Sequence, residues 1–167
     1  IKEWAFDSCR RLEKIEIPET TRVIERRAFI FCHGLEEERM YPKGLLEIHE
    51  SAFSDCKALT EVVLPSTLRE LGERAFEDCA RLKRVIFPEM NLKTIQQATF
   101  SCCGLLSITI PCGVELIEEE AFANCKDLRS ITIDASPKRP ALMIRKGAFR
   151  NFVALRPIQL PVGTAID

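Results

Sequence analysis

A block of about 23 residues recurs along almost the whole chain and limits what it can fold into. The stretches AFDSCRRLEKIEIP (5–18), AFSDCKALTEVVLP (52–65) and AFEDCARLKRVIFP (75–88) share an Ala-Phe pair, a Cys, a Leu and a closing Pro at fixed spacings. The repeat is marked by Phe6, Phe29, Phe53, Phe76, Phe100, Phe122 and Phe149. Such a period is typical of solenoids, in which a repeat buries its apolar residues only by packing on its neighbours.

The end of each repeat predicts a short β-strand. In LEKIEIP, LTEVVLP, LKRVIFP, LLSITIP and LRPIQLP, apolar residues alternate with exposed positions, and Val and Ile are frequent. Pro ends the strand because it has no N–H for the ladder and fixes its own φ. A second apolar pair, such as Leu68 and Leu71, should line the opposite inner wall. The spacing of Phe, Cys and Leu suits a tight turn or a 3₁₀ segment.

Read as Leu-x-x-Ile-x-Ile-Pro followed by Ile-x-x-x-Ala-Phe-x-x-Cys-x-x-Leu, the repeat resembles the BspA-like leucine-rich repeat family from Ile1 to Pro161. The resemblance implies a leucine-rich-repeat solenoid of the α/β-type horseshoe class, with mostly short parallel strands joined by tight turns or short helical segments. It also implies a protein without catalysis, often on bacterial or protist cell surfaces, that adheres to host or matrix proteins. Fold carries over more safely than ligand.

We expect residues 1–167 to form one solenoid of about seven coils. The chain begins and ends inside a repeat, whereas repeat stacks usually carry polar-faced terminal units. We therefore expect a fragment of a longer protein. Several places depart from the regular spacing: 32–42 is one residue longer and charged, either Cys102 or Cys103 takes the Cys position, and a bulge at 135–141 follows Asp134.

The eight Cys residues follow the repeat rather than a pairing scheme. One repeat position holds Cys9, Cys32, Cys56, Cys79, Cys125 and either Cys102 or Cys103. Equivalent side chains in a ladder point in parallel, whereas a disulfide needs the two Cβ atoms to face one another. We expect buried free thiols that act as small apolar groups. Cys112 lies outside this column, at a corner, and is the best candidate for a reactive thiol, although an inert surface Cys is the commoner case.

Composition and motifs argue against several classes of function. The 24 Lys and Arg and 25 Asp and Glu are spread through every repeat, which indicates neither a nucleic acid nor an anionic lipid partner. Apolar runs are too short to insert into a membrane. No phosphate loop, nucleophile elbow or paired-His motif occurs in the sequence, so we predict no enzyme and no cofactor. The Cys spacing does not suit zinc, and His33 and His49 should be solvated, so no metal site is predicted.

The aligned strands predict a binding face. Residues between the inward positions of stacked strands form open rows, and an apolar centre with a charged rim suits a protein interface. Val and Ile also favour strands whatever they bind. On this concave face the candidate partner-binding residues are Glu16, Glu61, Val63, Arg84, Ile86, Thr109 and Thr132. Lys138 and Arg139, in the bulge, are a second candidate.

The predicted function is therefore a non-catalytic protein–protein interaction module, which the family resemblance extends to an adhesin-like domain at the cell surface. The alternative is a structural spacer, or a segment that self-associates through uncapped end coils. The cysteines leave the compartment open, because buried free thiols persist both in reducing cytosol and outside the cell. A surface location is favoured by the resemblance alone.

Overall fold

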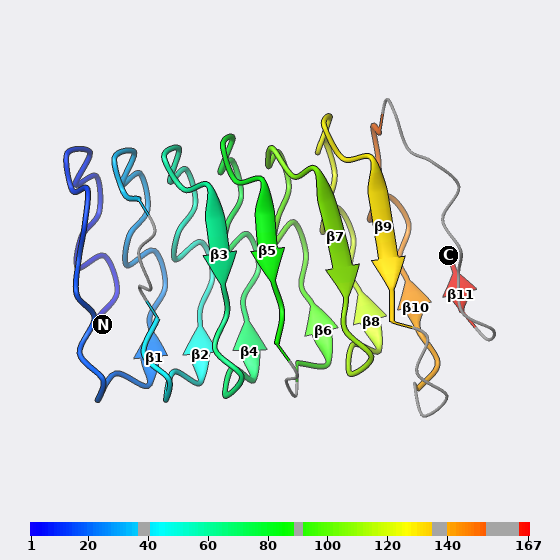
Figure 1. Cartoon of the computed structure of the whole chain (residues 1–167), viewed down its shortest axis with the longest axis horizontal. Coiled ribbons are helices and arrows are strands. Elements are labelled where there is room, and N and C mark those ends of the chain that lie inside the picture. The colour runs from blue at the N-terminus through cyan, green and yellow to red at the C-terminus, as the bar shows by residue number, and fades with distance from the viewer. Residues whose placement is uncertain (37–40, 89–91, 135–139, 153–163) are drawn as a thin grey trace.

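The chain folds as a solenoid of coils stacked along one axis. The structure is a computed structural model that describes residues 1–36, 41–88, 92–134, 140–152 and 164–167. Within these ranges the chain forms eleven short strands and no helix. Figure 1 shows the coils side by side, from the N-terminal coil at the left to the C-terminal segment at the right. The predicted solenoid of short parallel strands is confirmed.

One side of the solenoid carries the longer strands. They are β3 (Glu61–Val63), β5 (Arg84–Ile86), β7 (Ser107–Ile110) and β9 (Ser130–Ile133). β3 pairs in parallel with β5, and β7 pairs in parallel with β9. The two pairs are joined where the strands begin, because the Leu106 N–H donates to the Lys83 carbonyl at 3.2 Å. Three of the predicted strand stretches are thereby confirmed, and LRSITI is a fourth of the same kind.

The strand predicted in the first repeat is wrong, since LEKIEIP (12–18) contains no strand. This stretch lies in the first coil, which has a neighbouring coil on one side. The Glu36 N–H, which donates to the Glu13 carbonyl at 2.9 Å, links it to that coil. The irregular stretch 32–42 lies partly outside the described residues, and the strand predicted in LRPIQLP lies wholly outside them.

The opposite side carries a second set of parallel strands, which run in the reverse direction in Figure 1. Each is two residues long: β1 (Val23–Ile24), β2 (Glu47–Ile48), β4 (Glu70–Leu71), β6 (Thr94–Ile95), β8 (Leu116–Ile117), β10 (Met143–Ile144) and β11 (Ala165–Ile166). Their order is β1-β2-β4 and β6-β8-β10-β11. The sequence predicted an inner wall here, and Leu68 and Leu71 are indeed fully buried. That this wall is itself hydrogen-bonded as a sheet was not predicted.

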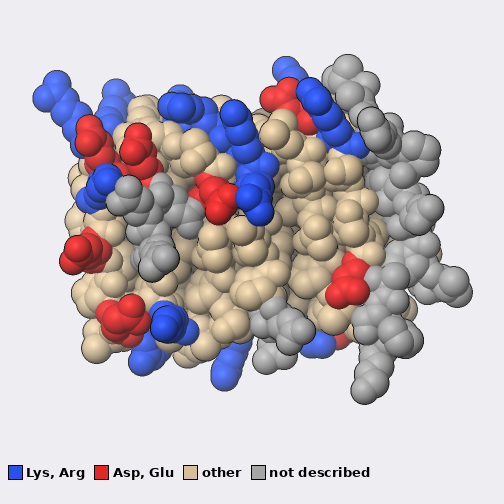
Figure 2. Space-filling model, viewed as in Figure 1, with Lys and Arg blue, Asp and Glu red and all other residues tan. Residues whose placement is uncertain are grey.

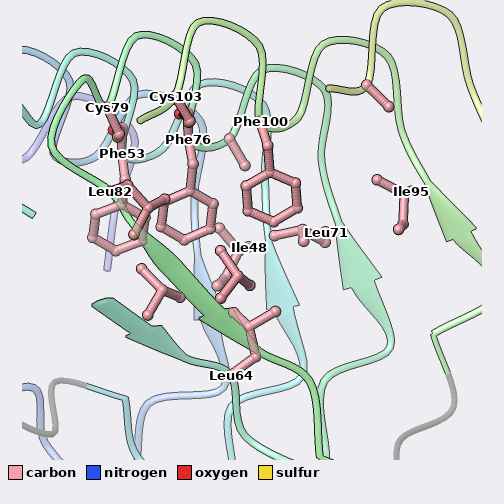
Figure 3. Packing of buried hydrophobic residues seen from close by; sticks show 14 of the residues in the cluster. Ile48, Phe53, Leu64, Leu71, Phe76, Cys79, Leu82, Ile95, Phe100 and Cys103 are labelled. Carbon is pink, nitrogen blue, oxygen red and sulfur yellow. Dashed lines mark hydrogen bonds between the residues drawn. The ribbon is translucent and has the colours of Figure 1, made fainter. Parts of the chain in front are cut away.

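A single file of Phe rings fills the core. Successive rings from Phe6 to Phe149 are stacked, with centroids 5.0–5.6 Å apart and planes within 11° of parallel. The five inner rings are fully buried, whereas Phe6 and Phe149 are partly buried. Figure 3 shows Phe53, Phe76 and Phe100 side by side, with Cys79 and Cys103 near the turns above them. The seven Phe residues that mark the repeat therefore form one continuous column.

The turns around each Phe explain why no helix forms. Residues two positions before and two after the ring adopt left-handed backbone conformations, such as Arg74 (φ 54°) and Asp78 (φ 59°) around Phe76. A left-handed residue stops a right-handed helix, and each such non-Gly residue costs about 1–2 kcal/mol. The turn is held to the next coil, since the Phe53 N–H donates to the Ala75 carbonyl at 2.8 Å. In the part of the chain that the structure describes, no helix could span a membrane.

Candidate partner-binding face

The structure brings most of the predicted binding residues together on the side of the longer strands. Glu61 is the lateral partner of Arg84, Val63 that of Ile86, and Thr109 that of Thr132. These side chains point away from the core, because the residues between them are the buried Val62, Val85, Ile108 and Ile131. We define the strand face as the outward side chains of the four longer strands: Glu61, Val63, Arg84, Ile86, Ser107, Thr109, Ser130 and Thr132.

Two predicted groups do not join this face among the described residues. Glu16 is exposed in the first coil, outside any strand, and the coil between it and β3 includes residues that are not described. Lys138 and Arg139 lie outside the described residues. Whether the strand face is concave, and whether it binds a partner, stay predictions.

The apolar part of the surface extends beyond the predicted pair. Val63 is 46% exposed, and Ile86 beside it is half-buried. Leu106, immediately before β7, is 42% exposed and was not among the predicted site residues. A signal for it exists in the sequence, because the equivalent positions in neighbouring repeats hold the polar residues Lys83 and Arg129.

An ion pair spans the upper part of this face. The Arg84 Nη1 lies 3.3 Å from the Glu61 Oε2, and the two side chains are 65% and 42% exposed. An exposed pair of this kind contributes roughly 0–1 kcal/mol to stability. Both groups are therefore free to exchange this contact for one with a partner at little cost.

Positive charge gathers where the longer strands begin. Figure 2 shows Lys and Arg side chains along the upper edge of this side, above a largely uncharged area over β7 and β9. The segments 80–84, 104–107 and 126–130 hold five cationic residues and one acidic residue, Asp127. We call the five cations the basic margin: Arg81, Lys83, Arg84, Lys126 and Arg129. The even charge balance of the whole chain gave no sign of this local excess.

A small depression lies next to the basic margin. Its volume is about 350 Å³, and its lining includes Cys102, Gly104 and Lys126. The repeat here has one residue between Cys103 and Leu105 instead of two. Gly104 is required by the close packing that results, because a Cβ there would lie 2.4 Å from the Ala80 carbonyl oxygen. The chain thereby places Cys103, rather than Cys102, in the Cys column.

The Cys column is unpaired, as predicted, and its members from Cys32 onward are buried, whereas the burial predicted for Cys9 is wrong. Five thiols donate to the Phe carbonyl of the preceding coil at 3.0–3.3 Å: Cys32 to Phe6, Cys56 to Phe29, Cys79 to Phe53, Cys103 to Phe76 and Cys125 to Phe100. Burial raises the pKa of Cys32 to about 11 and that of Cys125 to about 12. The Cys32 and Cys125 thiols therefore stay protonated at neutral pH. Cys9 is exposed, and Cys112 is half-buried rather than exposed.

One cluster on the second sheet has donors that could hold a metal ion. Glu47 and Glu70 are lateral partners on β2 and β4, and the His49 Nε2 lies 2.9 Å from the Glu47 Oε2. One donor atom from each of the three residues lies within 4.8 Å of the other two. Glu70 is exposed, whereas Glu47 and His49 are half-buried at the surface, so the cluster would hold a cation weakly. It belongs to the side opposite the strand face.

Comparison with known proteins agrees with this architecture. The family model of the BspA type leucine rich repeat region matches in six copies, over residues 1–91 and 35–156. A search of curated proteins finds no match. The chain is also similar to solved structures. One is a leucine rich cell surface protein from Faecalibacterium prausnitzii A2-165, with a TM-score of 0.74 and 22% sequence identity. That alignment covers 98% of this chain and 58% of the Faecalibacterium chain.

Two further solved structures are leucine-rich repeat proteins. The one from Eubacterium ventriosum has a TM-score of 0.77 at 25% sequence identity. The alignment covers 90% of this chain and 40% of the Eubacterium chain. The one from Bacteroides ovatus has a TM-score of 0.64 at 25% sequence identity. The alignment covers 99% of this chain and 54% of the Bacteroides chain. The chain thus spans about half the length of the solved structures that it matches.

Proposed function

Because the chain belongs to the BspA-type leucine-rich repeat family, we propose that it is a protein-interaction module whose partner docks on the strand face. The observation that carries this proposal is the alignment of Val63 with Ile86, beside the exposed Leu106, within rows of hydroxyl and charged side chains. A stable interface needs an apolar centre that loses its water and a polar rim that selects the partner. The strand face and its basic margin supply both.

The strand face suits this role better than the second sheet. Its strands reach four residues in β7 and β9, so each presents two outward residues, Ser107 with Thr109 and Ser130 with Thr132. The strands of the second sheet are two residues long and present one each. A partner on the strand face therefore meets several parallel rows instead of a single one.

The test replaces the apolar centre by charge. In Val63→Asp with Ile86→Asp, both side chains lie on the outward face, so circular dichroism should stay near that of the wild type, while the two adjacent carboxylates lower the melting temperature modestly. Docking would bury two carboxylates without partners, which we expect to abolish binding. Met143→Asp with Thr94→Asp places the same charges on the second sheet and should bind as the wild type does.

The partner is unidentified, so the probe is a random dodecapeptide display library selected on the immobilised wild-type chain. Peptides that bind the wild type and the second-sheet control, but not the Val63/Ile86 variant, would support the strand face. Peptides that bind all three equally would refute it.

A spacer or self-associating segment is the second candidate. It is favoured by the first coil, where Phe6, Leu12 and Ile15 are only partly buried. Sedimentation velocity over a range of concentrations should then show growth of the wild type that Leu12→Lys with Ile15→Lys prevents. A monomer at all concentrations would argue against this role.

A cell-surface location is part of the proposed function. It rests on the family, one structural relative of which is a cell surface protein. Antibody labelling of intact and permeabilised cells tests it, and labelling restricted to permeabilised cells would contradict it.

A further inference from the structure

The basic margin points to the chemistry of the partner. Resting on the proposed function, we propose that the docked segment is an extended acidic peptide. It places two carboxylates on Lys83 and Arg129, with an apolar side chain between them on Leu106.

These three residues occupy one row across consecutive coils. The Leu106 N–H donates to the Lys83 carbonyl at 3.2 Å, and the Arg129 N–H donates to the Leu106 carbonyl at 3.0 Å. All three side chains are exposed. Neighbouring coils stack at about 4.8 Å, so the two cations are anchored about 10 Å apart with Leu106 midway. In an extended peptide every second side chain faces the same side, so residues i, i+2 and i+4 share one face and residues i and i+4 lie about 13 Å apart. The Lys83 and Arg129 side chains are long and exposed, so their charged ends can reach this spacing. The row therefore suits acidic residues at positions i and i+4 with an apolar residue at i+2.

The cations of this row are available to a ligand. Within the described ranges, Lys83, Arg129, Arg81 and Lys126 take part in no ion pair. Arg84 has one, with Glu61, in a weak exposed contact. Asp127 is the one acidic group among the three segments of the margin. A chain whose formal net charge is -1 thus presents a local positive field at the rim of its apolar patch. Such a field steers an acidic partner and selects against a basic one.

The surroundings favour a peptide over other anionic polymers. Leu106 between the two cations, and Val63 and Ile86 below them, offer apolar contacts that a phosphate or sulfate backbone leaves unused. The outward rows of β7 and β9 carry Ser and Thr hydroxyls, which hydrogen-bond to peptide groups. The strand face as defined has no aromatic ring, the usual stacking platform for nucleic acid bases.

The experiment uses the same dodecapeptide selection. Peptides enriched on the wild type should carry Asp or Glu four residues apart, with an apolar residue midway between them. A fluorescent synthetic copy of the most enriched peptide then gives affinities by polarisation. Lys83→Glu with Arg129→Glu should weaken binding at least about tenfold, because attraction becomes like-charge repulsion. Higher salt should weaken wild-type binding, since these charges are exposed.

A matched control separates this effect from net charge. Arg69→Glu with Lys146→Glu makes the same change in charge at exposed positions beside the strands of the second sheet. It should leave the affinity unchanged, and the melting temperatures of both variants should stay near that of the wild type.

The outcomes distinguish this inference from the proposed function. Peptides that need Val63 and Ile86, lack acidic enrichment and bind the Lys83/Arg129 variant normally would overturn the acidic partner and leave the strand face standing. Peptides indifferent to Val63 and Ile86, or a library that yields no binder, would overturn both. Binding of heparin or single-stranded RNA more tightly than any selected peptide would replace the acidic peptide by an anionic polymer.

Discussion

The Phe column and the strand face follow the same repeat but obey opposite constraints. At the centre of each coil the residue stays Phe, and beside it mostly Cys, because each side chain must match the one below and above it. On the strand face the laterally paired residues change from coil to coil, as from Glu61 to Arg84. Burial fixes the inner column, and solvent leaves the outer rows open to selection for a partner.

Buried residues of the column therefore determine the fold, whereas exposed residues of the strand face are available for function. Phe76 touches two other rings and is fully buried, so a change there disturbs three coils at once. Arg84 has one exposed ion pair, and its loss disturbs little of the core. Inner substitutions should therefore lower stability, whereas outer ones should change binding at nearly constant stability.

The largest effect expected is that of Phe76→Ala. Truncating a large buried aromatic side chain costs roughly 3–5 kcal/mol in the free energy of unfolding, through lost burial and the cavity that remains. Phe6→Ala is the control, because Phe6 is partly buried and stacks on one ring, Phe29. It should cost less. Urea unfolding followed by circular dichroism measures both, and equal losses would contradict a column that is most deeply buried at its centre.

The same contrast explains what could be predicted from the sequence. The solenoid, the ring stack and the buried thiols could be predicted from the repeated Phe and Cys, because the inward-facing residues are the ones that recur in each repeat. The alternation of buried and exposed positions around Val62 and Val85 predicted which residues of β3 and β5 point outward. Both follow from local patterns whose physical cause is burial.

Other features leave no such pattern. A two-residue strand such as β4 is too short to alternate, so the second sheet was seen only as an apolar wall. The left-handed turn positions hold residues such as Trp4 and Arg74 rather than Gly, and so escaped notice. The basic margin was missed because total charge does not say on which side the charges lie. Leu106 was not among the predicted site residues because its signal is a contrast with the equivalent residues of neighbouring repeats, such as Lys83 and Arg129, and not a periodic pattern.

High pH should destabilise the inner column. The pKa of Cys32 is raised from 9.0 to about 11, first by burial, and that of Cys125 to about 12. The unfolded chain loses these protons above about pH 9, whereas the folded chain holds them. This contribution to stability is therefore complete below pH 9 and is lost as the pH rises through 11 and 12.

Urea unfolding at a series of alkaline pH values measures this loss. Cys32→Ala with Cys125→Ala should show a shallower decline than the wild type, because two of the titrating thiols are gone. Cys112→Ala gives the control, since Cys112 lies outside the Cys column and its replacement keeps both buried thiols. If all three curves coincide, the buried thiols do not control the alkaline limit.

The smallest effect is expected at the ion pair of the strand face. Glu61→Gln removes the charge that faces Arg84 while keeping the size of the side chain, and both groups are exposed. The free energy of unfolding should change by less than about 1 kcal/mol, the usual limit for a surface pair. Affinity for an acidic peptide should rise at the same time, because Arg84 loses its competing carboxylate and the local field becomes more positive. Thermal unfolding and polarisation measurements on the same sample test both halves. A large loss of stability would show that this outer row is part of the scaffold, and a fall in affinity would show that Glu61 itself contacts the partner.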